Sequence, residues 1–318
     1  MREKLLVVED LKVYYDTPEG TVKAVDGVDL NLGENEILGI AGESACGKST
    51  LAYGLIRLCE YPRYIAGGKI FFEGINLLEV SEEEMRKVRR RGIALIPQAA
   101  MNALNPVIRI ESQFSDVLEP LNISKAEAKK LISTSLKNLG LSPDVLKKYP
   151  HELSGGMKQR VVISMATILN PKVLIADEPT SALDVISQRE VLQLIMDLIK
   201  KSKSSMILIT HDMAIHAECV DKLAIMYAGQ IVEIGDVNMI FKNPKHPYTK
   251  ILISSVPSLS KKGILEGASG KPPDLLNPPP GCRFHPRCPN ASKICIQKEP
   301  ELIEIDDDWK VACHLYGS

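Results

Sequence analysis

The stretch Leu153–Arg160 reads LSGGMKQR, and it stands between two other motifs typical of nucleotide chemistry. Upstream, Gly42–Ser49 reads GESACGKS and matches the phosphate-binding pattern Gly-x-x-x-x-Gly-Lys-Ser. Downstream, Val173–Glu178 reads VLIADE, an apolar run that ends in two acids. The Ser-Gly-Gly turn opens a helix, so it predicts a second anion-binding helix start in a chain whose own loop already holds phosphates. We expect this second start to cap the nucleotide of another subunit.

In that order the three motifs resemble the ATP-binding cassette family, the ATPase subunits of ABC transporters. The resemblance covers nearly the whole chain. It implies an α/β fold: an ABC-type nucleotide-binding domain with a RecA-like parallel-sheet core, an antiparallel β layer and a helical insert, followed by a small C-terminal cysteine-containing region. It also implies an ATPase that converts ATP and water to ADP and phosphate while a solute is translocated.

Length and composition favour an ordinary globular chain. The sequence has 318 residues, of which 45% are hydrophobic and 25% charged, with a formal net charge of -1. This balance gives no general field for nucleic acid or an anionic membrane. No apolar run approaches the roughly 20 residues that span a bilayer. We therefore expect a peripheral protein at the cytoplasmic face of the cell membrane, attached through its partners.

Short apolar strands alternate with amphipathic helices, which indicates a mostly parallel, buried sheet. The early strands are joined by short turns and indicate an antiparallel layer. The expected strands are 5–8, 36–41, 69–72, 93–96, 172–176, 206–210, 222–226 and 230–234; the expected helices are 48–59, 81–91, 124–139, 157–169, 184–201 and 213–218. We predict a cassette domain over residues 1–241 with a helical subdomain at about 99–167, and an accessory region over 242–318.

The phosphate loop Gly42–Ser49 follows an expected strand and precedes an expected helix, as the motif requires. Lys48 would reach the β- and γ-phosphates, and Ser49 would bind Mg²⁺. Ala45 stands where the family usually has glycine, and a positive φ there would cost roughly 1 kcal/mol. Cys46 is either a small residue that packs beside the phosphates or a residue whose thiol is regulatory. The other residues predicted to contact nucleotide from this loop are Gly42, Glu43, Ser44, Gly47 and Thr50.

The acids and polar residues at strand ends supply the expected chemistry. Asp177 ends a buried apolar strand and fits the role of a Mg²⁺ ligand. Glu178 beside it would orient or deprotonate the attacking water. The resemblance implies that Gln98 contacts Mg²⁺ or the water, and that His211 bonds the γ-phosphate.

Two further sets of residues complete the expected ATP site. Tyr15 aligns with the family's adenine-stacking aromatic, although Tyr14 beside it is an alternative. On the partner's nucleotide, the residues expected to act are Ser154, Gly155, Gly156 and Gln159.

The C-terminal sequence resembles one branch of the family, the oligopeptide and dipeptide importer ATPases. The residues that carry this resemblance are Thr17–Val25, Asn243–Lys250, Cys282–Cys288, Cys295, Pro300 and Val311–His314. The resemblance implies a heterodimer with a related ATPase, two transmembrane permease subunits and an external solute-binding protein. Import of oligosaccharides, or a soluble ABC ATPase outside transport, stays an alternative function.

Four of the seven cysteines crowd the end of the chain: Cys282, Cys288, Cys295 and Cys313. In a reducing compartment such a cluster more often binds a metal than forms disulfides. A proline-rich tail buries little apolar surface and needs a staple, so we expect a structural [4Fe–4S] cluster, far from the phosphate site. Zinc is the alternative, as are thiols that hold no metal. His285 and His314 are possible substitute ligands.

Overall fold

The computed structural model describes residues 3–317 except 120–122, 182, 256–269 and 307. The chain divides into two compact units. Residues 1–81 and 207–318 form the first unit, and residues 82–206 form the second. Both units combine strands with helices, which confirms the expected α/β class. No helix in the described ranges is long and apolar enough to cross a bilayer.

The first unit begins with an antiparallel sheet in the order β2-β1-β4-β5, which confirms the expected antiparallel layer. Its strands are β1 (Lys4–Thr17), β2 (Gly20–Gly33), β4 (Arg63–Phe72) and β5 (Ile75–Asn76). The sequence predicts only a fragment of β1 and misses β2. Irregularities in the pairing of β1 with β2 interrupt the alternation of buried and exposed side chains on which a strand prediction depends.

The first unit also holds strands in the order β11-β12-β10-β9-β3, with β3 and β9 parallel. These strands are β3 (Ile37–Ala41), β9 (Lys222–Tyr227), β10 (Gln230–Asp236), β11 (Ile303–Asp306) and β12 (Trp309–Val311). The helices of this unit are α1 (Lys48–Leu55), α7 (Met213–Cys219), α8 (Val237–Lys242), α9 (Pro247–Ser254) and α10 (Lys293–Gln297). Every residue of β9 is buried, so the core of this unit lies along it.

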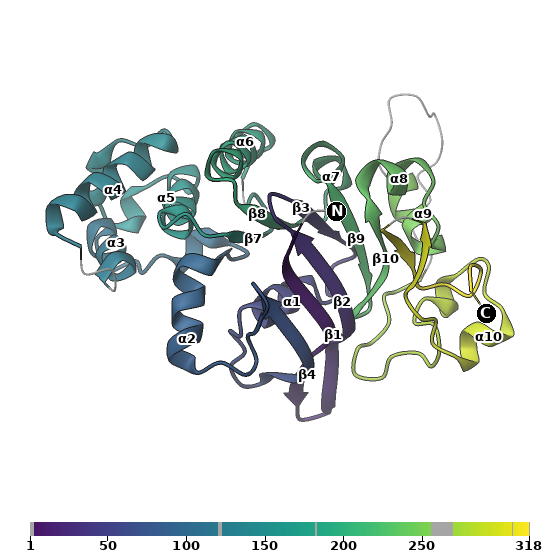
Figure 1. Cartoon of the computed structure of the whole chain (residues 1–318). Helices are drawn as coiled ribbons and strands as arrows, with labels where there is room; N and C mark the ends of the chain where they lie inside the picture. The colour runs from purple at the N-terminus through teal and green to yellow at the C-terminus, as the bar shows by residue number, and fades with distance from the viewer. Residues whose placement is uncertain (1–2, 120–122, 182, 256–269, 307, 318) are drawn as a thin grey trace. The chain divides into compact units, whose positions relative to one another are not determined.

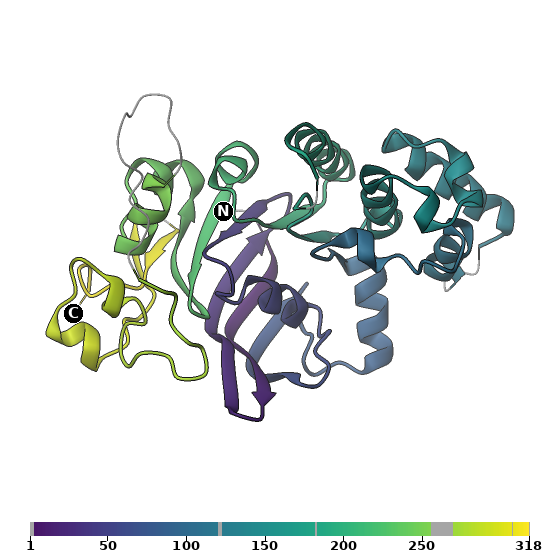
Figure 2. The same ribbon diagram turned by 180° about the vertical axis from the view of Figure 1, so that it is seen from behind.

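The tail, which we define as residues 242–318, belongs to the first unit and packs against the rest of it. Strand β12 pairs antiparallel with β10 (Figure 2). The buried carboxylate of Glu233 accepts hydrogen bonds from Trp309 Nε1 at 3.0 Å and from the His246 amide at 2.9 Å. Buried charge is stable only when it is paired or hydrogen-bonded, so Glu233 fixes both segments of the tail. The division into 1–241 and 242–318 stays a prediction.

The second unit contains the parallel pair β6 (Ile93–Ile96) and β7 (Val173–Asp177). Between these two strands the described residues form only helices and loops, as expected for residues 99–167. The helices are α2 (Glu82–Lys87), a π-helix (Val88–Gly92), α3 (Ile110–Leu118), α4 (Lys125–Asn138), α5 (Gly155–Thr167) and α6 (Val185–Ser202), and α3, α4 and α5 gather together in Figure 1. Strand β8 (Ser205–Ile209) straddles the division between the units.

Candidate active site

The phosphate loop runs from β3 into α1 with glycine at both ends. Gly47 has φ 109° and is the N-cap of α1. A Cβ at Gly47 would lie 2.0 Å from the Ala24 carbonyl oxygen, and one at Gly42 would lie 2.2 Å from the Met226 carbonyl oxygen. Both neighbours are backbone atoms that cannot move aside. Only glycine therefore fits at these two positions, and the loop keeps the backbone path that an anion cradle requires.

Lys48 lies buried inside the loop. Its Nζ donates hydrogen bonds to the carbonyls of Gly42 and Glu43, both at 2.8 Å, and lies 3.6 Å from the Cys46 sulfur. The loop therefore already surrounds a positive charge. Burial raises the pKa of the Cys46 thiol, which keeps it protonated. A protonated, buried thiol favours the packing role for Cys46 over the regulatory one.

Ala45 adopts φ 62°, in the left-handed region. The loop forms although alanine is strained there, as the sequence predicts. The strain costs on the order of 1 kcal/mol relative to glycine.

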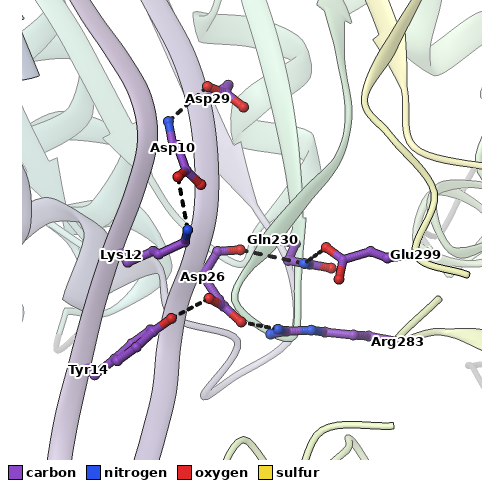
Figure 3. Close-up of polar contacts among 8 residues, drawn as sticks. All are labelled: Asp10, Lys12, Tyr14, Asp26, Asp29, Gln230, Arg283 and Glu299. Carbon is purple, nitrogen blue, oxygen red and sulfur yellow. Dashed lines mark hydrogen bonds and ion pairs between the residues drawn. The ribbon is translucent and has the colours of Figure 1, made fainter. Parts of the chain in front are cut away.

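Tyr15 lies beside the start of α1, because its hydroxyl is 3.0 Å from Thr50 Oγ1. Tyr14 instead donates to Asp26 at 2.6 Å (Figure 3) and packs edge-on against Tyr64. Of the two tyrosines, only Tyr15 contacts a residue of the nucleotide-binding segment. This contact supports Tyr15 as the stacking aromatic.

In the second unit, Gln98 and Glu178 meet. The Gln98 side-chain amide donates to Glu178 Oε2 at 3.1 Å. Glu178 follows β7 with φ 45°, a conformation in which strain is stored at functional sites. Asp177, the last residue of β7, is fully buried. The carboxylate of Glu178 thus stands on a strained backbone, accepts a hydrogen bond from Gln98 and neighbours the buried Asp177. This arrangement is suited to activating water.

The turn Ser154–Gly156, hereafter the signature turn, starts α5. The Ser154 hydroxyl caps the helix by accepting from the Met157 amide at 3.3 Å. Within the described chain, a Cβ at Gly156 would meet no atom within 4 Å. The turn lines a cavity of about 850 Å³ that two basic and two acidic residues also border, Lys148, Arg160, Asp144 and Asp184. The helix start itself presents its amides to an anion.

Gln159 is buried on α5, and its side-chain amide donates to the Pro179 carbonyl. This bond fixes the loop that follows Glu178. His211 is exposed just after β8 and lies in the first unit with the phosphate loop. The expected roles of Gln159 and His211 toward nucleotide stay predictions, as do the other assigned roles.

The four tail cysteines, all free thiols, line one cavity of about 40 Å³ together with His285 and His314. Among the described residues, no group of three or more Cys, His, Asp or Glu side chains is placed to hold a metal ion. The two observations differ because a single ion requires its ligands about 2.3 Å from one point, whereas lining a common cavity is less demanding. The cluster and the zinc alternative are not supported beyond this shared cavity.

The expectation that the cysteine region lies far from the phosphate site is wrong. Arg287, between Cys282 and Cys288, donates from both terminal nitrogens to the two carboxylate oxygens of Glu43 at 2.8 Å each. Tyr248 of α9 accepts from the Glu43 amide at 2.9 Å. Sequence reasoning missed both residues, since Glu43 and Arg287 stand 244 positions apart. The one sequence feature that could have drawn attention to Arg287 and Tyr248 is that each lies in a tail segment typical of the importer branch.

Comparisons with known proteins agree with this geometry. Residues 25–181 match the family model "ABC transporter", and residues 232–295 match the "Oligopeptide/dipeptide transporter, C-terminal region". The dipeptide transport ATP-binding protein DppD of Caldanaerobacter subterraneus is 45% identical over 98% of this chain and 97% of its own length. The oligopeptide transport ATP-binding protein OppD of Bacillus subtilis is also 45% identical, over 98% of this chain and 89% of its own.

Solved structures resemble the fold as well. A dimeric post-hydrolysis structure of the ATP-binding cassette MJ0796 bound to ADP and Pi aligns with a TM-score of 0.66 and 26% identity, covering 73% of this chain and 98% of the other. The expected fold and the expected ATPase activity are thereby confirmed. The chain belongs to the ABC transporter family of ATP-hydrolysing subunits, in its group of dipeptide and oligopeptide transport ATP-binding proteins.

Proposed function

We propose that this ATPase powers the import of dipeptides or oligopeptides from the cytoplasmic face of the membrane. The observation that carries the proposal is the C-terminal match of residues 232–295, which adds to an ABC cassette the tail named after such transporters. The proposed partners are two transmembrane permease subunits and a related ATPase subunit. An external solute-binding protein would act on the complex indirectly. Relatives named for dipeptide and for oligopeptide transport match equally well, so the proposal covers both peptide classes.

For ATP, the phosphate loop supplies the binding groups. Glycine at positions 42 and 47 lets the backbone amides face an anion, and Lys48 supplies the positive charge. Tyr15 would stack on the adenine ring. Ser49, Gln98 and Asp177 would hold Mg²⁺, which neutralises phosphate charge when bound.

Hydrolysis would use the carboxylate of Glu178. It takes a proton from water, whose oxygen bonds to the γ-phosphorus as the bond to the ADP oxygen breaks. The hydrogen bond from Gln98 supports this role, since it orients the carboxylate. His211 would hydrogen-bond the γ-phosphate and hold it in line.

The signature turn would act on the nucleotide of the partner ATPase. Ser154 and the first amides of α5 form an anion-attracting helix start, and a Cβ at Gly156 would meet no other described part of the chain within 4 Å. Glycine in a helix costs about 0.5–1 kcal/mol relative to alanine, so its presence needs a cause. Close approach of a phosphate from another subunit supplies one.

The tail thiols would hold a [4Fe–4S] cluster. The chemistry of the donors fits, because four cysteines line one cavity. The cluster would supply cross-linking of a segment that has little regular structure. In anaerobically purified protein we expect iron and sulfide near four each per chain. Stoichiometric zinc, or four freely titrating thiols with no metal, would each overturn the cluster.

Transport in proteoliposomes tests the peptide assignment. The chain is co-purified with its permeases and partner ATPase and supplied with the binding protein. We expect ATP-dependent uptake of dipeptides or oligopeptides and faster ATP hydrolysis in their presence. The same complex carrying Glu178→Gln is the control. Stimulation by oligosaccharides instead of peptides would reassign the solute, and failure to co-purify with any membrane subunit would remove the transport role.

A further inference from the structure

Glu43, the second residue of the phosphate loop, is held at each of its polar groups. Its carboxylate accepts two hydrogen bonds from Arg287, and its amide donates to the Tyr248 hydroxyl. Its carbonyl accepts from Lys48 Nζ at 2.8 Å. Arg287 and Tyr248 belong to the tail, whereas Lys48 belongs to the loop itself. The tail therefore determines where the first half of the loop lies.

The groups that hold Glu43 are themselves rigid. The side chain of Arg287 is only 6% exposed and that of Tyr248 is buried. Four buried rings pack against one another and form what we call the aromatic cluster: Tyr227, His246, Tyr248 and Phe284. The Tyr227 hydroxyl also accepts from Arg287 at 3.2 Å. A planar guanidinium that binds a carboxylate through two parallel bonds fixes orientation as well as distance.

The charge of Glu43 makes this contact matter for binding. A carboxylate in a loop that wraps phosphates repels the ligand it serves. Arg287 lies directly on that carboxylate and cancels its charge. Removing Arg287 would therefore loosen the loop and also expose a negative charge to the phosphates.

We propose that Arg287 and Tyr248 are positioning residues of the ATP site, through which the tail sets the affinity of the phosphate loop. The inference rests on the proposed role of Gly42–Ser49 in holding the phosphates. It gives the tail a function in the chain's own nucleotide site, apart from any metal that its cysteines hold.

The test measures binding of AMP-PNP with Mg²⁺ by calorimetry on the full chain. We expect Arg287→Ala to raise the Kd about 10- to 30-fold, and Arg287→Lys to raise it less, since lysine keeps the charge and loses the fork. Tyr248→Phe, which removes one acceptor, should raise the Kd about threefold. In the assembled transporter, Arg287→Ala should raise the KM for ATP while kcat at saturation stays within about twofold.

Arg283 offers a matched control. It lies in the same tail segment, its side chain is 7% exposed, and it pairs with Asp26 (Figure 3) and donates to the Ala228 carbonyl, neither of which belongs to the phosphate loop. Arg283→Ala should lower the melting temperature, as Arg287→Ala does, because each removes a buried ion pair, but it should change the Kd less than about threefold. An equal rise in Kd for both variants would show that the tail acts only through stability and would overturn the proposal.

A double-mutant cycle tests whether Arg287 acts through Glu43. In a Glu43→Gln background the repelling charge is absent, so adding Arg287→Ala should raise the Kd only about two- to threefold. Additive effects would contradict action through Glu43. Lys48→Ala separates the two proposals: if that variant keeps full affinity, the phosphate-loop assignment itself fails; if it abolishes binding while Arg287→Ala does nothing, only the tail inference fails.

Discussion

The phosphate loop and the signature turn each place glycine at the start of a helix, but they differ in how closely the rest of the described chain surrounds that glycine. At the phosphate loop, the Ala24 and Met226 carbonyls lie against Gly47 and Gly42, Lys48 bonds the loop carbonyls, and Arg287 of the tail holds Glu43. At the signature turn, Ser154 caps its own helix, and a Cβ at Gly156 would meet no atom of the described residues within 4 Å apart from the local backbone of α5. The phosphate loop is therefore held by residues of its own chain, whereas the signature turn leaves space in which a group from another molecule can lie.

The glycines of the two regions are present for different reasons. Gly42 and Gly47 are required by the fold, because a Cβ would strike the protein's own backbone. Gly156 is not required by the fold at all. Substitutions at the loop should therefore weaken nucleotide binding by the isolated chain, whereas substitutions at the signature turn should weaken hydrolysis only in the assembled pair.

Glu178→Gln gives the largest expected effect and separates chemistry from both binding regions. The substitution keeps the shape of the side chain and removes the base. We expect MgATP binding to persist and hydrolysis to fall on the order of 10²–10⁴-fold. Phosphate release must be measured with the partner's site disabled. Near-normal turnover in that sample would rule out Glu178 as the base.

Ser154→Arg tests the signature turn directly. The substitution removes the cap of α5 and places a long side chain where another subunit's nucleotide is proposed to lie. ATP affinity of the isolated chain should stay within about twofold, and hydrolysis by the assembled pair should fall roughly 10- to 100-fold. Weakened ATP binding by the isolated chain would contradict the proposed action on the partner's nucleotide, because the turn would then act on the nucleotide of its own chain.

Acidification should loosen the first unit before the second. His216 and His246 are buried in the first unit, and burial lowers their pKa values to about 4 and about 3. Below pH 6.5 the unfolded chain gains protons at these rings and the folded chain does not. Stability is therefore complete above pH 6.5 and falls between pH 6.5 and 4, by about 1.4 kcal/mol per pH unit for each histidine.

Amide exchange, corrected for its intrinsic pH dependence, measures this loss separately in each unit. The second unit has one histidine, His151, which is exposed. His216→Gln should flatten the pH dependence of the first unit, since glutamine can still donate to the Thr210 carbonyl, the present acceptor of His216 Nε2. Equal acid sensitivity of both units would contradict this account.

Local chemistry made much of the site predictable. The phosphate loop and the strained Ala45 follow from residues close together in sequence. Strand β2 was not predicted, because its irregular pairing with β1 interrupts the alternation of buried and exposed side chains. The contact of Arg287 with Glu43 could not be predicted, since nothing local marks which of many arginines meets a given acid across 244 positions.

The smallest effects come from exchanging alanine and glycine between the two regions. Ala45 has φ 62°, so Ala45→Gly should relieve strain and raise the free energy of unfolding by about 0.5 kcal/mol, after the greater flexibility of glycine in the unfolded chain is counted. Gly156→Ala should also stabilise, by about 0.5–1 kcal/mol, because the helix has room for a methyl group. Both values come from chemical denaturation. Hydrolysis by the assembled pair distinguishes them: it should be unchanged for Ala45→Gly and reduced for Gly156→Ala. Full activity of Gly156→Ala would mean that no phosphate approaches the turn closely, and the contrast between the two regions would then lose its functional meaning.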